Sequence, residues 1–261
     1  MKIGLVLSGG GMRGVAHIGA IKALGEYEIV PTHIAGTSSG AIVGAFFAKG
    51  YAWNEILEFF RKLSIFSVSR YALNKPGFID SEKFYLEFQQ YFPEDDFSSL
   101  KIPLWITATN ILNGNLQTFH QGPLIKPLLA SASFPGVFTP VPIEDSFYVD
   151  GGVLNNFPVE SIRSFCDKVI GVYVNPFEYK AKEYFKHSYN VLEQAYQIKN
   201  AKESFPKFQQ CDLVILPKGL RGIGMFAFKQ VDQIFNLGYE EAKIQLDSEI
   251  GKQLFNSEGG T

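Results

Sequence analysis

The chain has 261 residues, 46% of them hydrophobic, and a formal net charge of −2 at pH 7. A chain of this size can bury one large core. It carries no Lys/Arg stripe or arginine-rich arm, which argues against nucleic acid as a partner. Its two cysteines, Cys166 and Cys211, lack metal-binding spacing and fit a reducing compartment, so we expect no metal site.

The first predicted strand, Ile3–Ser8, runs into three consecutive glycines at positions 9–11 and then into the helical stretch Val15–Leu24. Such glycines leave backbone N–H groups uncovered, so this loop can point donors at an oxyanion. The segment Gly9–Gly14 also satisfies the Gly-x-Gly-x-x-Gly fingerprint of dinucleotide-binding folds. That alternative requires an acidic residue at the end of the second strand, where the chain has Ala35-Gly36-Thr37, and is therefore disfavoured.

The second predicted strand, Thr32–Ala35, leads into a Gly-x-Ser-x-Gly pattern that is typical of a sharp strand-to-helix turn. A Cβ at Gly36 or Gly40 would crowd the neighbouring backbone, while Ser38 is held at the tip of the turn. The apolar run Ala41–Ala48 reads as a buried helix that ends at a C-terminal glycine, residue 50. Ser38 then lies at a helix N-terminus, where the helix dipole favours the negative charge of a nucleophile.

An antiparallel pair and an acidic residue follow. The segments Leu104–Ile111 and Leu116–Phe119 flank Asn113-Gly114, a dipeptide typical of hairpins, so we expect this pair to interrupt a parallel sheet. Ser146–Val149 is a further short strand, and Asp150 stands at its C-terminal end, where open α/β sheets place functional residues. Asp150 can act there as a general base for Ser38, and Gly151 and Gly152 let the chain turn away.

The rest of the chain continues the alternation of strands and helices. Val169–Val174 and Leu213–Leu216 read as buried strands. Between them lies a predicted helix, and near the end of the chain comes a long amphipathic helix. Their apolar positions are Val191, Leu192, Ala195, Ile198 and Ala201 in the first, and Val231, Ile234, Phe235, Gly238, Ala242 and Leu246 in the second. We expect a single domain over residues 1–255, with a polar tail at 256–261.

The three glycine-bearing motifs, in this order, resemble those of the patatin-like phospholipase family. They are Gly-Gly-Gly-x-Arg-Gly at 9–14, Gly-x-Ser-x-Gly at 36–40 and Asp-Gly-Gly at 150–152. The stretch Ala130–Phe138 is similar to the family's Ala-Ser-x-x-x-Pro segment, and Ala16–Gly19 is also similar. The resemblance spans about residues 1–218, and nothing from Arg221 onward adds to it.

The resemblance implies a fold, a site and an activity. The fold is a three-layer α/β/α domain around a mainly parallel sheet, and the activity is hydrolysis of lipid esters without a cofactor. The substrate class would be phospholipids, lysophospholipids or acylglycerols. Ser38 would be the nucleophile and Asp150 the general base, and the oxyanion hole would be formed by Gly9, Gly10, Gly11, Met12, Arg13 and Gly14. Arg13 would either meet a phosphate head group or brace the loop.

Two alternatives share these motifs. An α/β-hydrolase with a Ser-His-Asp triad places its acid and then its histidine after the nucleophile. Only His187 follows Asp150 here, in a charged stretch that is typical of a solvated face, while His17 is better explained by packing or capping. The second alternative is a catalytically silent module that binds lipid; the complete set of motifs favours an enzyme over it.

Several phenylalanines are crowded between the serine motif and the hairpin. They either form an aromatic core, which is the more frequent case, or line a groove for an acyl chain or a membrane-facing lid. The loop Gly222–Phe228 is a second candidate for lipid contact. We expect a cytoplasmic protein with possible peripheral membrane contact, because no signal peptide is evident and the longest apolar block, Ala41–Ala48, is too short to span a bilayer. The clustered phenylalanines are Phe59, Phe60, Phe66, Phe78, Phe84, Phe88 and Phe92.

Overall fold

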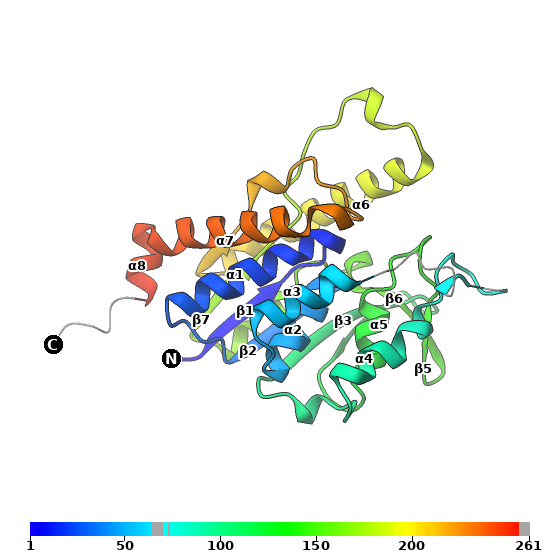
Figure 1. Ribbon diagram of the computed structural model, residues 1–261, viewed down its shortest axis with the longest axis horizontal. Coiled ribbons are helices and arrows are strands. Elements are labelled where there is room, and N and C mark those ends of the chain that lie inside the picture. Colours follow the sequence, from blue (N-terminus) through cyan, green and yellow to red (C-terminus); the bar gives the residue numbers. More distant parts are fainter. Residues whose placement is uncertain (64–69, 73, 256–261) are drawn as a thin grey trace.

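A computed structural model describes residues 1–63, 70–72 and 74–255, and it contains one mixed, mainly parallel sheet of eight strands (Figure 1). The strand order is β5-β6-β3-β2-β1-β7-β8, and β4 pairs with β3 outside this path. Strands β1, β2, β3, β7 and β8 are parallel to their neighbours in this group, whereas β4, β5 and β6 pair antiparallel. The strands are β1 (Ile3–Leu7), β2 (His33–Thr37), β3 (Leu104–Asn110), β4 (Leu116–Phe119), β5 (Val141–Ile143), β6 (Ser146–Asp150), β7 (Lys168–Val172) and β8 (Leu213–Ile215).

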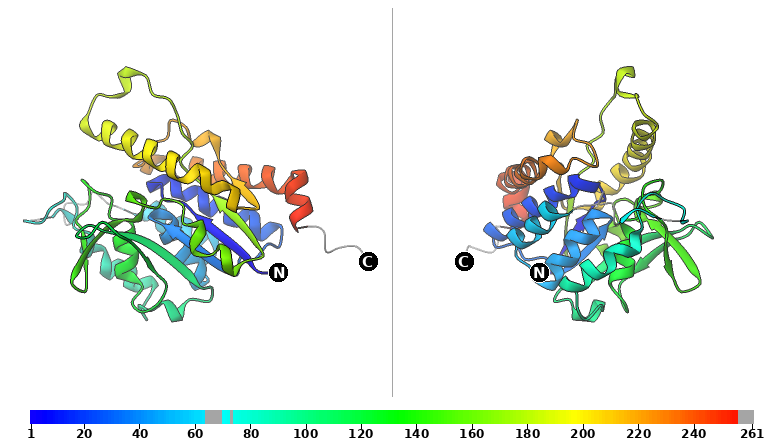
Figure 2. Two further views of the ribbon diagram at one scale, coloured as in Figure 1. Left: turned by 180° about the vertical axis from the view of Figure 1, so that it is seen from behind. Right: turned by 45° about the vertical axis from the view of Figure 1, so that its right-hand side comes forward.

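Helices cover both faces of the sheet, as the three-layer prediction requires (Figures 1 and 2). Side chains alternate along β1, so that Leu5 and Leu7 face one core and Val6 faces the other. The first core lies under α1, α2 and α7, and the second lies under a run of short 3₁₀ turns and Phe208, just after α6. The helices are α1 (Val15–Glu26), α2 (Ser39–Lys49), α3 (Trp53–Lys62), α4 (Tyr85–Tyr91), α5 (Ile125–Ser131), α6 (Ser188–Ser204), α7 (Val231–Asp247) and α8 (Glu249–Phe255).

Two strands of opposite direction meet end to end beside β3. Residues 104–107 of β3 pair with β2 and residues 108–110 pair with β6, while residues 106–109 pair with β4. Because β4 overlaps both of the other pairings, it occupies one edge of β3, and β2 and β6 share the opposite edge. Thr37 is opposite Thr107 and Asp150 is opposite Ala108, so the C-terminal ends of β2 and β6 meet.

This arrangement corrects one step of the sequence argument. We expected Asp150 at the C-terminal edge because parallel strands end there, but β6 runs antiparallel to β3. Strand β3 extends past the C-terminal end of β2, and β6 pairs with this extension while running antiparallel to β3. The C-terminal residue of β6, Asp150, therefore lies next to the C-terminal end of β2. The position was predicted correctly and the reason was wrong.

The predicted helix near the end of the chain is α7, and its predicted apolar face is buried against α1. The two helices approach closely at glycines. A Cβ on Gly238 would collide with the backbone of Ala16, and a Cβ on Gly19 would collide with the carbonyl of Phe235. Helix α7, which lies beyond the stretch that resembles the family, is therefore packed directly on the helix that follows the glycine loop.

Helix α6 lies where it was predicted, but of its five predicted apolar positions only Ala201 is buried. Val191 is 55% exposed and Ile198 is 50% exposed, whereas Glu193, Gln197 and Asn200 are buried. Apolar spacing normally marks the buried face of a helix. Here the helix covers a polar region of the sheet edge, so its polar side chains are the ones that find partners inside.

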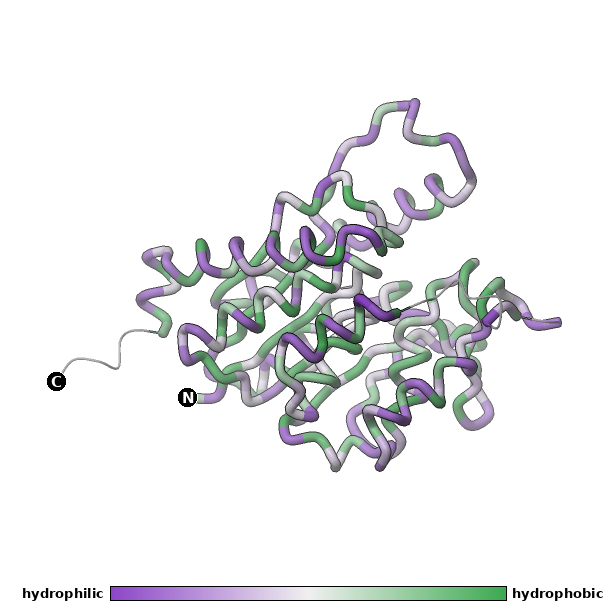
Figure 3. The backbone as a smooth tube through the Cα atoms, viewed as in Figure 1, coloured by the Kyte–Doolittle hydropathy of each residue, from purple (hydrophilic) through white to green (hydrophobic). Residues whose placement is uncertain are grey.

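Apolar residues are concentrated in the central strands, and polar residues in the outlying loop before α6. In Figure 3 the central strands are mostly green, whereas the loop that precedes α6, at the top, is mostly purple. Within the described part of the chain, no helix combines the length and the apolar character needed to cross a bilayer. Phe66 and the predicted polar tail at 256–261 lie outside the described residues.

Candidate active site

Ser38 is held at the tip of the predicted turn in a strained backbone conformation. Its φ is 55° and its ψ is −126°, and it forms the N-cap of α2. The flanking glycines are required by space, because a Cβ on Gly40 would collide with the Leu7 carbonyl and a Cβ on Gly36 would lie 2.7 Å from the Ala41 nitrogen. This strained turn directs a serine at the end of β2 toward the meeting point of β2 and β6.

Asp150 is the other residue at this meeting point, and it is buried, with 3% of its surface exposed. Its Oδ1 accepts hydrogen bonds from the Gly152 N–H at 2.7 Å and from the Tyr196 hydroxyl at 3.4 Å. Burial raises the pKa of Asp150 to about 6, and hydrogen bonds from Gly152, Ser38 and Tyr196 oppose this rise. A carboxyl group with this pKa is suited to take up and return a proton near neutral pH.

The Ala130–Phe138 stretch accepts a hydrogen bond from the backbone N–H of each of Ser38 and Asp150. The Ser131 hydroxyl accepts a hydrogen bond from the Ser38 N–H at 2.8 Å. The carbonyl of Ser133 accepts one from the Asp150 N–H at 3.0 Å. The segment that we singled out only by resemblance therefore fixes the backbone on both sides of the site.

The glycine loop lies beside Ser38, but only part of it has amide groups that can serve a ligand. The Gly9 N–H donates to the Asn156 carbonyl at 3.2 Å, and the Met12 N–H donates to the Met225 carbonyl at 2.8 Å. Among the described residues, no protein acceptor is found for the N–H groups of Gly10 and Gly11. Of the six residues predicted for an oxyanion hole, these two glycines present donors that remain available.

Two asparagines hold the carbonyl of Gly9 and so set the direction of the loop. Asn156 and Asn175 both donate from Nδ2 to this oxygen, the former at 3.5 Å. His17 acts on the residue before the loop: it is fully buried, and its Nε2 lies 2.8 Å from the Ser8 carbonyl. Burial lowers the pKa of His17 to about 4, so the ring is neutral and donates to this carbonyl.

Arg13 braces the loop from inside, and it also lines two polar cavities. It is buried, and it donates from Nε to the Gly10 carbonyl at 3.3 Å and from Nη1 to the Ile223 carbonyl at 3.4 Å. Burial lowers its pKa, and the nearby Glu193 carboxylate opposes this shift. The brace works through carbonyl groups, and it ties the glycine loop to the segment before α7.

We expect Arg13→Met to lower the free energy of unfolding by about 2 kcal/mol, because two hydrogen bonds from a charged, buried donor to backbone carbonyls are lost. Urea unfolding followed by circular dichroism measures the change. Arg221→Met is the matched control, since Arg221 is an exposed arginine from the same region. Equal stability of both variants would show that Arg13 is not a brace.

The histidines do not form a triad with this site. Among the described residues that line the cavities around Ser38 there is no histidine. His187 is exposed at the start of α6, and His33 and His120 stack on Trp105 at ring distances of 5.9 and 6.0 Å. The Ser-His-Asp alternative therefore finds no candidate for its histidine.

An apolar pocket opens next to Ser38 and Asp150. It holds about 780 Å³ of empty space including its open mouth. Its walls come from α2, α3, α4, α5 and the loop before α7. The phenylalanines of the wall are Phe59, Phe60, Phe84, Phe88, Phe134, Phe138 and Phe226.

The crowded phenylalanines divide between the core and the wall of the pocket. Phe59, Phe60, Phe84 and Phe88 are buried in the core and also form part of the pocket wall, whereas Phe92 is core alone and Phe78 is exposed. In the loop Gly222–Phe228, Phe226 lines the pocket and Phe228 is partly buried beside it. This loop therefore contributes to the pocket rather than standing free of the protein.

Comparison with known proteins identifies the family. The family model described as patatin-like phospholipase matches residues 5–162, which is more than half of the chain. The chain belongs to the patatin-like phospholipase family. An uncharacterized NTE family protein of Mycobacterium tuberculosis is 33% identical over 183 residues, covering 68% of this chain and 50% of that protein. Lysophospholipase NTE1 of Scheffersomyces stipitis is 29% identical over 167 residues, which cover 62% of this chain and 11% of that protein.

A solved structure agrees with the fold. The crystal structure of VipD from Legionella pneumophila superimposes with a TM-score of 0.56 at 14% sequence identity, covering 94% of this chain and 67% of VipD. This similarity confirms the predicted architecture of a helix-covered, mainly parallel sheet. The chain spans half or less of the length of the two sequence relatives described above.

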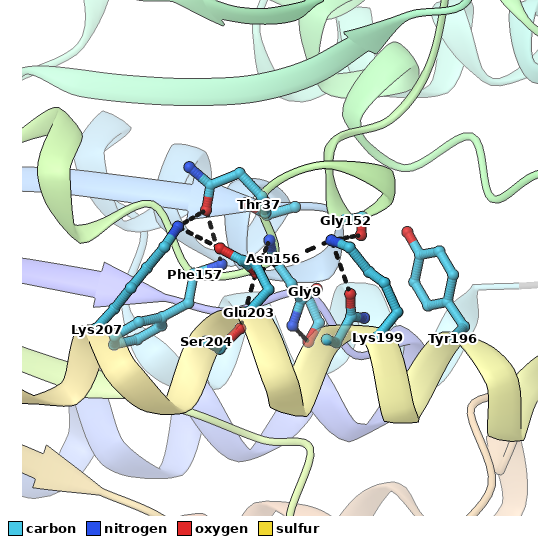
Figure 4. Close-up of polar contacts among 12 residues, drawn as sticks. Gly9, Thr37, Gly152, Asn156, Phe157, Tyr196, Lys199, Glu203, Ser204 and Lys207 are labelled. Atoms are coloured by element: carbon cyan, nitrogen blue, oxygen red, sulfur yellow. Dashed lines mark hydrogen bonds and ion pairs between the residues drawn. The ribbon is translucent and has the colours of Figure 1, made fainter. Parts of the chain in front are cut away.

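Several residues of this patatin-like site were not found from the sequence. Tyr196 contacts Asp150, and Lys199 donates to the Gly152 carbonyl at 3.0 Å; both come from α6, as Figure 4 shows. The other residues that the sequence did not predict are Met225 and the two asparagines that hold the Gly9 carbonyl, Asn156 and Asn175. The sequence could have indicated the two asparagines, because Asn156 closely follows Asp-Gly-Gly and Asn175 follows the end of a predicted strand. It gave no such indication for Tyr196 and Lys199, because the spacing of the apolar residues of α6 predicted the opposite face to be buried.

Proposed function

We propose that this protein is a serine-dependent lipid acyl hydrolase of the phospholipase A or lysophospholipase type that acts through a Ser38/Asp150 dyad. The observation that carries the proposal is that Ser38 and Asp150 lie together at one end of an apolar pocket, beside two available amide donors. The family membership and the name of the lysophospholipase relative support a lipid ester as the substrate. Cytoplasmic location and peripheral membrane contact stay predictions.

The proposed reaction has two steps and needs no cofactor. Asp150 takes the proton of the Ser38 hydroxyl, Oγ attacks the carbonyl carbon of the ester, and the N–H groups of Gly10 and Gly11 bind the developing oxyanion. Asp150 returns the proton to the leaving alcohol. In the second step Asp150 activates water, which releases the fatty acid and restores Ser38.

A catalytically silent lipid-binding module is the alternative, and the same pocket would serve it. The raised pKa of Asp150 favours an enzyme, because burying a carboxyl group next to a serine costs stability and has no use in a binding module. We also propose that residues 1–255 form one domain, since α7 packs along α1 near the start of the chain.

The pocket should set the preference for acyl length. Ile42, on α2, lines the apolar pocket, and Ile42→Trp would fill part of it. We expect the variant to lose about tenfold or more in kcat/KM for p-nitrophenyl laurate and to keep most of its activity on the acetate ester. Ile244→Trp, at an exposed position of α7, is the control. A parallel loss on both esters would place the acyl chain elsewhere, and no hydrolysis by the unaltered protein would favour the silent module.

A further inference from the structure

A second cavity, small and polar, also touches Ser38 and Asp150. Its walls come from the glycine loop, the segment after Asp150 and α6, whereas the apolar pocket is walled by α3, α4 and α5. The space is sufficient for about one water molecule. We call it the polar chamber, and its wall residues besides Ser38 and Asp150 include Gly10, Asn156, Asn175, Tyr196, Gln197 and Asn200.

Oxygen atoms converge on one side of the polar chamber, around Gly152. A Cβ on this glycine would lie 2.5 Å from the Tyr196 hydroxyl, 2.9 Å from Asn156 Oδ1 and 3.0 Å from Asp150 Oδ1. Figure 4 shows Tyr196 and Lys199 projecting from α6 toward the segment that contains Gly152. A buried water needs two to four polar partners, and Tyr196, Asn156 and Asp150, which all line the polar chamber, can supply them.

We propose that the polar chamber holds the water that hydrolyses the acyl-enzyme, and that its small size excludes larger alcohols as acyl acceptors. This inference rests on the proposed function. The water oxygen attacks the ester carbonyl carbon while Asp150 accepts its proton. The bond between that carbon and Ser38 Oγ then breaks, Asp150 returns the proton to Oγ, and a carboxylic acid leaves, so that one water is consumed for each ester bond.

Three residues, Arg13, Gln197 and Met225, line both the polar chamber and a larger polar cavity that lies between α6 and the loops around Glu178 and Arg221. Arg13 and Met225 also hold the glycine loop through hydrogen bonds, whereas Gln197, which is 9% exposed, takes no part in holding it. Gln197 thus helps to separate the one-water space from a wider one. Shortening its side chain would join the two and leave Ser38, Asp150 and the glycine loop in place.

Competition between water and alcohols for the acyl-enzyme tests whether the size of the polar chamber selects the acyl acceptor. The protein is incubated with p-nitrophenyl butyrate and methanol, ethanol or propan-1-ol, and the ratio of alkyl ester to free acid is measured by chromatography. We expect the ratio to fall steeply from methanol to propan-1-ol in the unaltered protein. Gln197→Ala and Gln197→Ser should raise it for propan-1-ol by about fivefold or more. Ile198→Ala, at the neighbouring exposed position, should not change it.

The outcomes separate this inference from the proposed function. Unchanged ratios in both Gln197 variants, with p-nitrophenol still released and melting temperatures retained, would overturn the chamber as the acceptor site. A rise in Phe60→Ala instead would overturn it as well, because the acceptor would then enter through the apolar pocket. Absence of p-nitrophenol release and of fluorophosphonate labelling in the unaltered protein would remove the acyl-enzyme, and the proposed function with it.

Discussion

Ser38→Ala is expected to abolish ester hydrolysis, with kcat lowered by about 10⁵-fold or more, because the covalent route is closed when Oγ is removed. Labelling by a fluorophosphonate probe should disappear with it. Ser39→Ala is the matched control. Ser39 is the next residue, is also buried, and its hydroxyl has no hydrogen-bond partner among the described residues. Labelling that persists in Ser38→Ala would show that another residue is the nucleophile.

A second inactive variant tests the strain at this turn independently of the chemistry. The φ of 55° at Ser38 is one that glycine adopts without cost, so Ser38→Gly should raise the free energy of unfolding by about 1 kcal/mol while abolishing activity. An inactive protein that is more stable than the unaltered one cannot owe its inactivity to misfolding. A loss of stability would contradict the strained turn.

Asp150→Asn is expected to lower kcat/KM by about 10³-fold, because the serine loses its general base while the carbonyl oxygen of the amide keeps the hydrogen bond from Gly152. With the pKa of Asp150 raised to about 6 by burial, kcat/KM of the unaltered protein should fall about tenfold per pH unit below pH 6 and level off above it. The variant should lose this dependence. Initial rates between pH 4.5 and 8 measure both, and a flat profile in the unaltered protein would exclude Asp150 as the base.

The pH dependence of folding stability tests the raised pKa of Asp150 independently of activity. Between about pH 4 and pH 6 the folded protein keeps the proton of Asp150, while the unfolded chain has released it. The contribution of Asp150 to stability is therefore present at low pH and is lost as pH rises through this window. Asp150→Asn should be at least as stable as the unaltered protein at pH 7, and thermal unfolding in matched buffers checks this.

The sequence by itself was sufficient for the family and for most of the strands, whereas α3, α5, α8 and β5 were not predicted from it. The three glycine motifs each require a backbone conformation or a close approach that other residues do not tolerate, so they are readable without a fold. The Gly36–Gly40 turn and the C-terminal glycine at residue 50 are found as predicted. The apolar face of α7 was equally clear, because its spacing and its burial agree.

Tertiary structure decided how these motifs meet and what surrounds them. The closeness of Ser38 and Asp150 follows from β2 and β6 sharing one edge of β3, and such a pairing over long sequence distance has no local signal. It also decided that α6 turns its polar face inward, since burial of Gln197 and its neighbours depends on partners from distant segments. Propensity and periodicity describe one element at a time, whereas the site is built from contacts between elements, and these exist only in the folded chain.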